Sequence, residues 1–292
     1  MPELDVLTAP APAKVNLVLE VTGVRPDGYH EIDTILQTLE LADTVTISRG
    51  DRDGVAVEGP FATGTPADET NLAWGAATAL AQRCGRSVEG LGISLRKEIP
   101  AAGGLGGGAS DAATTLRLLQ RWWPEATEAH VRAAAAEVGS DEAFFLVGGT
   151  ARARGRGEQV TPLPPFERQA VVLFVPPATI ERKTARMFAA LDQHPFDEGA
   201  VVEKFVREFS RSIRAADVYN AFERVAFDVF DGLGALWETL EQRAGVPVRL
   251  AGAGPTLFWI GTERDAAHVA GAAAGTPCTA ISTFTAESLW RR

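Results

Sequence analysis

The chain has 292 residues, 46% of them hydrophobic and 23% charged, which is typical of a globular protein with one large or two modest domains. Its formal net charge is -10, whereas a nucleic-acid-binding protein usually carries an excess of basic residues. We therefore expect no nucleic-acid partner. No apolar run reaches the roughly 18 residues of a membrane-spanning helix, and the N-terminus shows no basic and apolar leader, so we predict a cytoplasmic protein without a membrane partner.

The first third of the chain is predicted to be mostly β-sheet. Apolar or alternating runs at residues 15–21, 44–47 and 91–95 indicate strands, and turn-rich segments separate them. Lys14 and Asn16 lie two residues apart at the start of the first strand, so both side chains share one face. A solvated surface lysine is the simpler interpretation. However, only four of the 28 basic residues are lysines, which favours a specific role for this ammonium group.

Tyr29 and His30 follow Asp27-Gly28 and are expected on a loop. A partly buried aromatic at a hairpin tip would explain the tyrosine. The alternative is base recognition, because an aromatic face can stack on a pyrimidine while an imidazole hydrogen-bonds to its edge.

Helices are predicted at residues 71–83, 111–123 and 127–137, and Ser110 is expected to cap the second of them. The segment before that helix contains five glycines in the six residues 103–108. Glycines let the backbone approach a ligand closely, and a helix start attracts anions, so this loop is predicted to bind phosphate.

Other interpretations of the glycine loop are a flexible turn, a Walker A loop and a dinucleotide-binding loop. A Walker A loop is excluded, because no lysine occurs between Lys97 and Lys183. Gly104 to Ala109 match the dinucleotide pattern G-x-G-x-x-A, but the residues from Lys97 to Pro100 separate that pattern from the preceding strand. A dinucleotide enzyme therefore stays a weak alternative.

Asp141 follows a predicted helix and precedes an apolar, glycine-bounded run that indicates a strand. A turn or helix-capping aspartate would be the ordinary interpretation of Gly-Ser-Asp. Glu142 is expected to point away from the aspartate.

The proline-rich residues 161–167 indicate a division near Pro164, into domains at 1–164 and 165–292. Cys84 and Cys278 are widely separated and are expected to be buried, reduced thiols. The second half is predicted to contain strands at 170–175, 248–251, 256–260 and 279–284 and helices at 180–191 and 264–274, with further helices through Leu240.

Three segments resemble motifs of the GHMP kinase family. Residues 11–35 resemble its first motif, residues 100–110 its phosphate-binding motif, and residues 250–260 its third, glycine-turn motif. The triple glycine at 106–108 and the Gly-Tyr-His at 28–30 are similar to the branch whose substrate is a cytidine diphosphate-linked alcohol.

This resemblance implies an α+β fold with an N-terminal ribosomal-protein-S5-like domain and a C-terminal ferredoxin-like domain. It also implies an enzyme that uses ATP and Mg²⁺ to phosphorylate the 2-hydroxyl of that alcohol in non-mevalonate isoprenoid precursor biosynthesis. A kinase of another small alcohol and a non-catalytic nucleotide-binding protein on the same fold are the alternatives.

The resemblance also assigns site residues. Asp141 matches the catalytic aspartate, which in the family lies in a segment followed by F-x-x-G-G-x-A, and Lys14 matches the lysine beside it. Ala109 and Glu142 depart from the pattern, and Ser110 becomes the one nearby side chain for a phosphate or metal contact; the metal ligands are unknown. The expected ATP-binding residues are Pro100, Ala101, Ala102, Gly103, Gly104, Leu105, Gly106, Gly107, Gly108, Ala109 and Ser110. The expected substrate-binding residues are Asn16, Tyr29, His30, Thr184, Phe188, Gly252 and Gly254.

Overall fold

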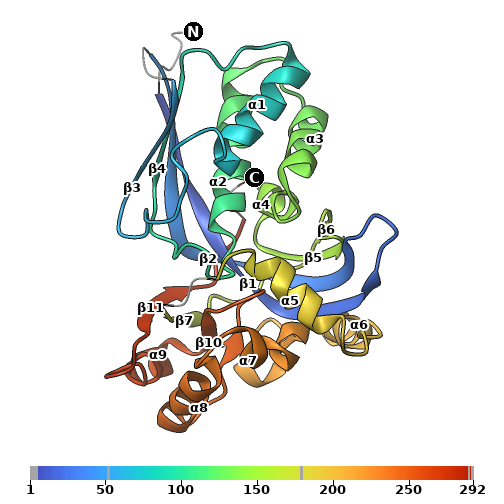
Figure 1. The fold of residues 1–292 in the computed structure, drawn as a ribbon, viewed down its shortest axis with the longest axis vertical. Coiled ribbons are helices and arrows are strands. Elements are labelled where there is room, and N and C mark those ends of the chain that lie inside the picture. Colours follow the sequence, from blue (N-terminus) through green and yellow to red (C-terminus); the bar gives the residue numbers. More distant parts are fainter. Residues whose placement is uncertain (1–5, 51–52, 178–179, 289, 291–292) are drawn as a thin grey trace.

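The computed structural model describes residues 6–50, 53–177, 180–288 and 290. Two β-sheets form its framework, and each carries its own helices (Figure 1). Within the described residues no helix is long and apolar enough to cross a membrane.

The larger sheet is built around a long antiparallel hairpin of β1 and β2, which pair from Val6 with Ser48 to Val24 with His30. The apolar side chains of β1 are buried from Ala11 to Val21, so most of this strand belongs to the core of the molecule. The strand order is β3-β4-β2-β1-β8, with β5 pairing with β2 and with β6. The strands are β1 (Val6–Val24), β2 (His30–Arg49), β3 (Gly54–Glu58), β4 (Leu91–Arg96), β5 (Thr150–Gly155), β6 (Gln159–Pro162) and β8 (Tyr219–Asn220).

Four helices lie together on one side of this sheet (Figure 1). Their small alanine side chains let α1 and α2 pack closely, and these helices share an apolar core with Leu36, Val45 and Ile93 of the strands. The helices are α1 (Leu72–Cys84), α2 (Gly107–Trp122), α3 (Glu128–Val138) and α4 (Glu142–Val147).

The smaller sheet has the order β11-β7-β10-β9, with every neighbouring pair antiparallel. Its central strand β7 has the continuous apolar sequence AVVLFV and is buried on both faces except at its last residue. The elements are β7 (Ala170–Val175), β9 (Arg249–Leu250), β10 (Leu257–Gly261), β11 (Thr279–Phe284), α5 (Lys183–Leu191), α6 (Ala200–Arg207), α7 (Ala226–Val229), α8 (Leu233–Ala244) and α9 (Glu263–Gly271), with 3-10 turns at Ala215–Asp217 and Ala221–Arg224.

The contacts between the second half of the chain and the first half include a strand pairing and a side-chain hydrogen bond near the C-terminal end. β8 pairs in parallel with β1, joining Val18 to Tyr219 and Leu19 to Asn220. Beyond β11, the Trp290 indole nitrogen donates to the carbonyl of Phe145 on α4. Both contacts join the two parts of the molecule close to the elements that form the site described below.

The predicted α+β class is confirmed, but some local predictions were wrong. The apolar run at 143–147 belongs to helix α4 and not to a strand, because a run this short does not distinguish the two. Helix α2 begins at Gly107, and Gly106 is its N-cap residue. Ser110 therefore lies inside the helix and does not cap it. The predicted helix at 180–191 begins at Lys183, and residues 178–179 lie outside the described part. Both cysteines are free but only half-buried.

Candidate functional site

One large cavity of about 1060 Å³ lies between the glycine loop, the middle of β1, the tip of the β1–β2 hairpin and helix α5. It is lined by every residue predicted to bind ATP or substrate, or to act in catalysis, except Ser110 and Gly254. The structure therefore brings together segments that are far apart in the sequence.

The glycine loop ends at the start of helix α2. Gly106 has a φ of 76°, a left-handed conformation that favours glycine. A Cβ atom there would lie 2.8 Å from Cζ of Phe145 and 3.0 Å from Cγ of Lys14. The 16-residue helix that follows exposes its first N–H groups and its positive dipole end toward the cavity. This arrangement suits a phosphate chain.

Ser110 lies deeper than expected. Its side chain is fully buried, and its Oγ atom has no hydrogen-bond partner among the described residues. Its predicted contact with phosphate or metal stays a prediction.

The start of the glycine loop is held by a buried ion cluster that the sequence analysis did not identify. The Lys97 ammonium donates to the carboxylates of Asp43 and Asp111. Asp43 also accepts hydrogen bonds from the backbone N–H groups of Glu98 at 2.6 Å and Ile99 at 2.8 Å. These contacts fix the chain immediately before Pro100.

Lys14 is buried beside the glycine loop. Its backbone N–H donates to the carbonyl of Leu105 at 2.9 Å, so β1 and the loop are directly joined. Its Nζ atom donates to Oδ1 of Asn16 at 2.8 Å, and Asn16 in turn donates to Thr34 at 2.8 Å. The expectation that Lys14 and Asn16 share one face is confirmed, and this chain of hydrogen bonds fixes the direction of the ammonium group.

Asp141 occupies the N-cap position of α4, but its carboxylate makes no capping hydrogen bond to that helix. Instead its Oδ2 atom lies 3.5 Å from Nζ of Lys14. The Asp141 side chain is 39% exposed and the Lys14 side chain 6% exposed, so the aspartate is the more accessible to a substrate. A carboxylate that does not cap its helix and lies adjacent to a cation can accept a proton from a bound hydroxyl.

Glu142 lies next to Asp141 but is buried against Gly139, where a Cβ atom would lie 2.6 Å from Oε2 of the glutamate. Burial raises the pKa of Glu142 to about 7, and the charge of Asp141 adds to this increase.

The third glycine turn contacts the first two motifs. A Cβ atom on Gly252 would lie 3.0 Å from the carbonyl oxygen of Gly104 and 3.2 Å from Nζ of Lys14. A Cβ atom on Gly104 would lie only 2.0 Å from the carbonyl oxygen of Ala251. Close backbone packing therefore requires glycine at both positions. Gly254 does not line the cavity.

Aromatic side chains from the hairpin tip and from α5 also line the cavity. The rings of His30 and Phe188 are stacked with centroids 4.1 Å apart, and Nε2 of His30 lies 2.7 Å from Oδ1 of Asp192. Phe188 therefore contacts the end of the β1–β2 hairpin through His30, and its predicted role in substrate binding stays a prediction. A base cannot lie between these two rings in this arrangement, since they already touch. Thr184, one turn earlier on α5, also lines the cavity.

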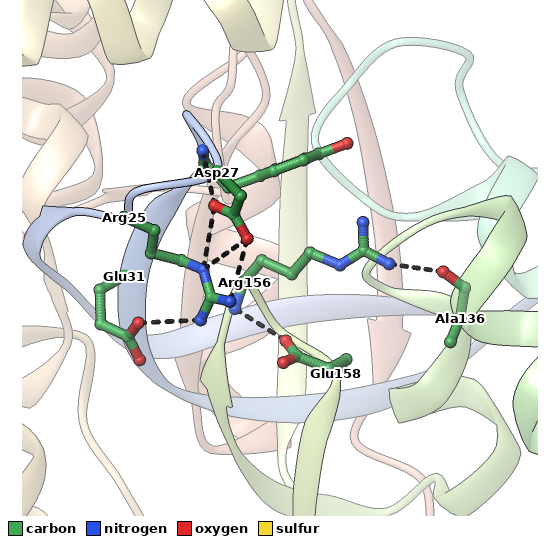
Figure 2. Close-up of polar contacts among 7 residues, drawn as sticks. Arg25, Asp27, Glu31, Ala136, Arg156 and Glu158 are labelled. Atoms are coloured by element: carbon green, nitrogen blue, oxygen red, sulfur yellow. Dashed lines mark hydrogen bonds and ion pairs between the residues drawn. The ribbon is translucent and has the colours of Figure 1, made fainter.

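Tyr29 is 51% exposed, and the guanidinium carbon of Arg156 lies 5.1 Å from its ring centroid. Figure 2 shows how this end of the hairpin is held: Arg156 reaches across to the carbonyl of Ala136, while Arg25 lies between Asp27 and Glu31. Arg156 covers one face of the tyrosine ring through a cation–π contact, which leaves the other face for a ligand.

Lys183 is a cavity residue that the sequence analysis did not assign. Its Nζ atom donates to the carbonyl of Ala102 at 2.6 Å and to that of Gly254. Burial lowers the pKa of Lys183 to about 8, with a further decrease from Lys14 that Asp141 partly opposes. The sequence did offer one indication of a specific role for Lys183, because it is one of only four lysines in the chain.

The described residues do not form a protein-only metal site: among them, no three His, Cys, Asp or Glu side chains lie close enough to hold an ion. Mg²⁺ commonly binds through substrate phosphates, water and only one or two carboxylates. A Mg²⁺ ion held in this way would bind mainly through phosphate oxygens and water and would not need a protein-only site.

Comparison with known proteins places this site in context. The family model for the GHMP kinases N terminal domain matches residues 71–149, and that for the GHMP kinases C terminal matches residues 198–276.

Similar full-length proteins are also known. The chain is 36% identical over 266 residues to a 4-diphosphocytidyl-2-C-methyl-D-erythritol kinase of Dehalococcoides mccartyi, covering 90% of this chain and 92% of the relative. It is 37% identical over 253 residues to the kinase of the same name from Bacillus subtilis, covering 85% and 86%. A crystal structure of 4-(cytidine 5'-diphospho)-2C-methyl-D-erythritol kinase superposes with a TM-score of 0.75 at 30% identity, covering 96% of this chain and 99% of that chain.

Proposed function

The chain belongs to the GHMP kinase family, and from this membership we propose that it transfers the γ-phosphoryl group of ATP to the 2-hydroxyl of 4-diphosphocytidyl-2-C-methyl-D-erythritol, a step of non-mevalonate isoprenoid precursor synthesis. One observation carries the proposal. A single cavity is lined by the glycine loop, by the aromatic side chains of Tyr29, His30 and Phe188, and by the Lys14–Asp141 pair.

The triphosphate of ATP would lie against the glycine loop and the start of α2. The backbone N–H groups of residues 107–109 have no partner within their own helix turn, so they can donate to phosphate oxygens. The division near Pro164, into 1–164 and 165–292, would place this loop in the first domain and the third glycine turn in the second.

Asp141 would accept the proton of the substrate hydroxyl, because its carboxylate is accessible and makes no capping bond to α4. Lys14 would hold Asp141 in place and offset the negative charge at the transferring group. Such a transfer depends mainly on positioning and charge, for which a fixed lysine is well suited. Mg²⁺, which the family resemblance implies, would enter with ATP and neutralise phosphate charge.

The cytosine of the substrate would bind at the aromatic end. The exposed ring of Tyr29 offers a stacking surface, and His30 offers a hydrogen-bonding edge that its contact with Asp192 orients. The diphosphate of the substrate would then lie toward Gly252, which lines the cavity beside Lys14.

The test is a phosphoryl-transfer assay with ATP and a panel of alcohols: the cytidine diphosphate-linked alcohol, the same alcohol without cytidine diphosphate, homoserine and mevalonate. We expect the first to have the highest kcat/KM by several orders of magnitude. A higher kcat/KM with one of the other alcohols would replace the substrate assignment. ATP binding without turnover of any alcohol would favour a non-catalytic protein.

A further inference from the structure

Lys183 joins two loops that come from different parts of the chain. Its ammonium group donates to the carbonyl of Ala102 in the glycine loop and to the carbonyl of Gly254 in the third glycine turn. Lys183 is itself the first residue of α5, the helix that carries Thr184 and Phe188. One side chain thus connects the predicted phosphate loop, the third motif and the substrate-side helix.

The backbone is strained at both ends of this connection. Among the described residues, the only two non-glycine residues with a positive φ are Ala102, at 55°, and Arg182, at 52°. Arg182 immediately precedes Lys183, and Ala102 supplies one of the two carbonyls that the lysine binds. A left-handed backbone is unfavourable for residues with a Cβ atom, so it persists only where surrounding contacts impose it.

The charged groups near Lys183 do not favour its ammonium form. Lys14 on β1 repels it, and Asp141 before α4 attracts it more weakly. Burial and this repulsion lower its pKa to about 8. A positive charge that is partly desolvated and repelled by Lys14 lowers the stability of the folded protein. Its presence here favours a role in the site over a role in stabilising the fold.

We propose that Lys183 is a positioning residue of the ATP site, which holds the glycine loop at Ala102 against the third glycine turn at Gly254 so that the loop is shaped to receive a triphosphate. This inference rests on the proposed function insofar as it takes the glycine loop to be the ATP site. Lys183 acts through the two carbonyls, and it need not touch the nucleotide.

The experiment measures binding of a non-hydrolysable ATP analogue to Lys183→Met, which keeps the length of the side chain but removes its charge. The matched control is Lys204→Met, because Lys204 is an exposed lysine on α6 that does not line the cavity. We expect the dissociation constant of the analogue to rise about tenfold or more in Lys183→Met and to stay unchanged in the control. The melting temperature of Lys183→Met should stay within a few degrees of wild type, because the loss of two hydrogen bonds is offset by the loss of a half-buried charge.

A pH series separates positioning by charge from simple packing. Lys183 is charged below its pKa of about 8 and neutral above it, so wild-type affinity for the analogue should fall as the pH rises through that value. Lys183→Arg keeps a permanent charge and can donate to two carbonyls, so its affinity should not fall over that interval. Lys183→Met should bind weakly at each pH.

The outcomes distinguish the two proposals. If wild type binds the analogue and Lys183→Met binds it equally well, the positioning role is wrong while the proposed function stands. If Lys183→Arg loses affinity with pH as wild type does, the titrating group is not Lys183 and the role assigned to its charge is wrong. If wild type does not bind the analogue at all, the ATP site of the proposed function fails.

Discussion

Nζ of Lys14 lies 3.5 Å from Oδ2 of Asp141, at the point where β1, the glycine loop and the start of α4 meet. Asn16 orients the lysine from one side, and the aspartate is left free because it does not cap its helix. The pair therefore combines a fixed cation with an accessible base.

We expect Asp141→Asn to lower kcat by about 10² to 10⁴, because the amide cannot accept the hydroxyl proton. KM should change little, since the shape and hydrogen-bonding capacity of the side chain are kept. Lys14→Met should give a comparable loss. The double variant should be far less impaired than the product of the two single effects, because the two groups act together.

Rapid-quench measurement of the phosphoryl-transfer step in the two single variants and the double variant is the test. A turnover rate of Asp141→Asn within a few-fold of wild type would show that Asp141 is not the base.

We expect Tyr29→Ala to raise KM for the cytidine-linked substrate by an amount equivalent to about 1–3 kcal/mol, the usual contribution of stacking on one base. Affinity for ATP should be nearly unchanged, because Tyr29 lies on the β1–β2 hairpin tip and not on the glycine loop. Arg156→Ala should shift KM in the same direction by less, since it removes the cation over the tyrosine ring but leaves the ring.

Arg154→Ala is the matched control for Arg156→Ala, because Arg154 is an exposed arginine near the end of β5 that does not line the cavity. Isothermal titration with the substrate and separately with an ATP analogue measures the two affinities. Equal losses for both ligands in Tyr29→Ala would contradict the assignment of this end to the base.

Gly106→Ala should reduce both stability and ATP affinity. A Cβ atom at this left-handed position is strained, costing about 1 kcal/mol or more, and it would also press on Phe145 and Lys14. Gly106→Val should be more severe, because its branched side chain needs still more room.

Gly75→Ala is the comparison, since Gly75 lies inside α1 without a positive φ, and a Cβ atom added there would meet no described atom within 4 Å apart from its chain neighbours and nearby helix backbone. Thermal unfolding should show it as stable as wild type or more so, because alanine favours a helix. ATP affinity of Gly106→Ala equal to wild type would show that the triphosphate does not approach this glycine.

Glu142→Gln should alter how stability depends on pH. The pKa of Glu142 is raised to about 7 in the folded protein, so between its ordinary value near 4.5 and 7 the folded state binds the proton more tightly than the unfolded state. The contribution of the protonated glutamate to stability is therefore present below pH 4.5 and is lost progressively as pH rises toward 7. We expect the glutamine variant to exceed wild type in melting temperature above this interval and to resemble it below.

Thermal unfolding over the same pH range is the measurement, with Glu89→Gln as an exposed control. A melting temperature of Glu142→Gln that runs parallel to wild type at every pH would show that Glu142 does not titrate in this way.

The sequence predicted those parts of the site that lie in short, ordered motifs. Lys14, Asn16 and the glycine loop could be assigned because strand periodicity and glycine spacing are local properties. The strands at 170–175 and 279–284 were predicted at their observed bounds, because short apolar runs between polar turns are typical strands.

Other features depend on tertiary structure and could not be predicted. Lys183 contacts Ala102 and Gly254, and Arg156 contacts Tyr29. These residues are far apart in the sequence, and no sequence pattern indicates that the fold brings them together. Phe144 and Phe145 were assigned to a strand, yet they lie in a short helix that packs against α2 and places Asp141 at its start. Short apolar runs fit both structures, and the packing decides between them.

The pairing of β8 with β1 bears on any attempt to express the two halves of the chain separately. In a fragment without Tyr219 and Asn220, part of one edge of β1 would lose its backbone partners. The side chains along this part of β1, from Leu17 to Leu19, are all apolar and would become more exposed. Such an open strand edge invites pairing with another chain. In the other fragment, Tyr219 and Asn220 would lose their backbone partners on β1, although Asn220 would still donate to the carbonyls of Leu250 and Gly252 at 2.9 and 2.8 Å. Mixing the two fragments should therefore restore solubility only when both are present during refolding.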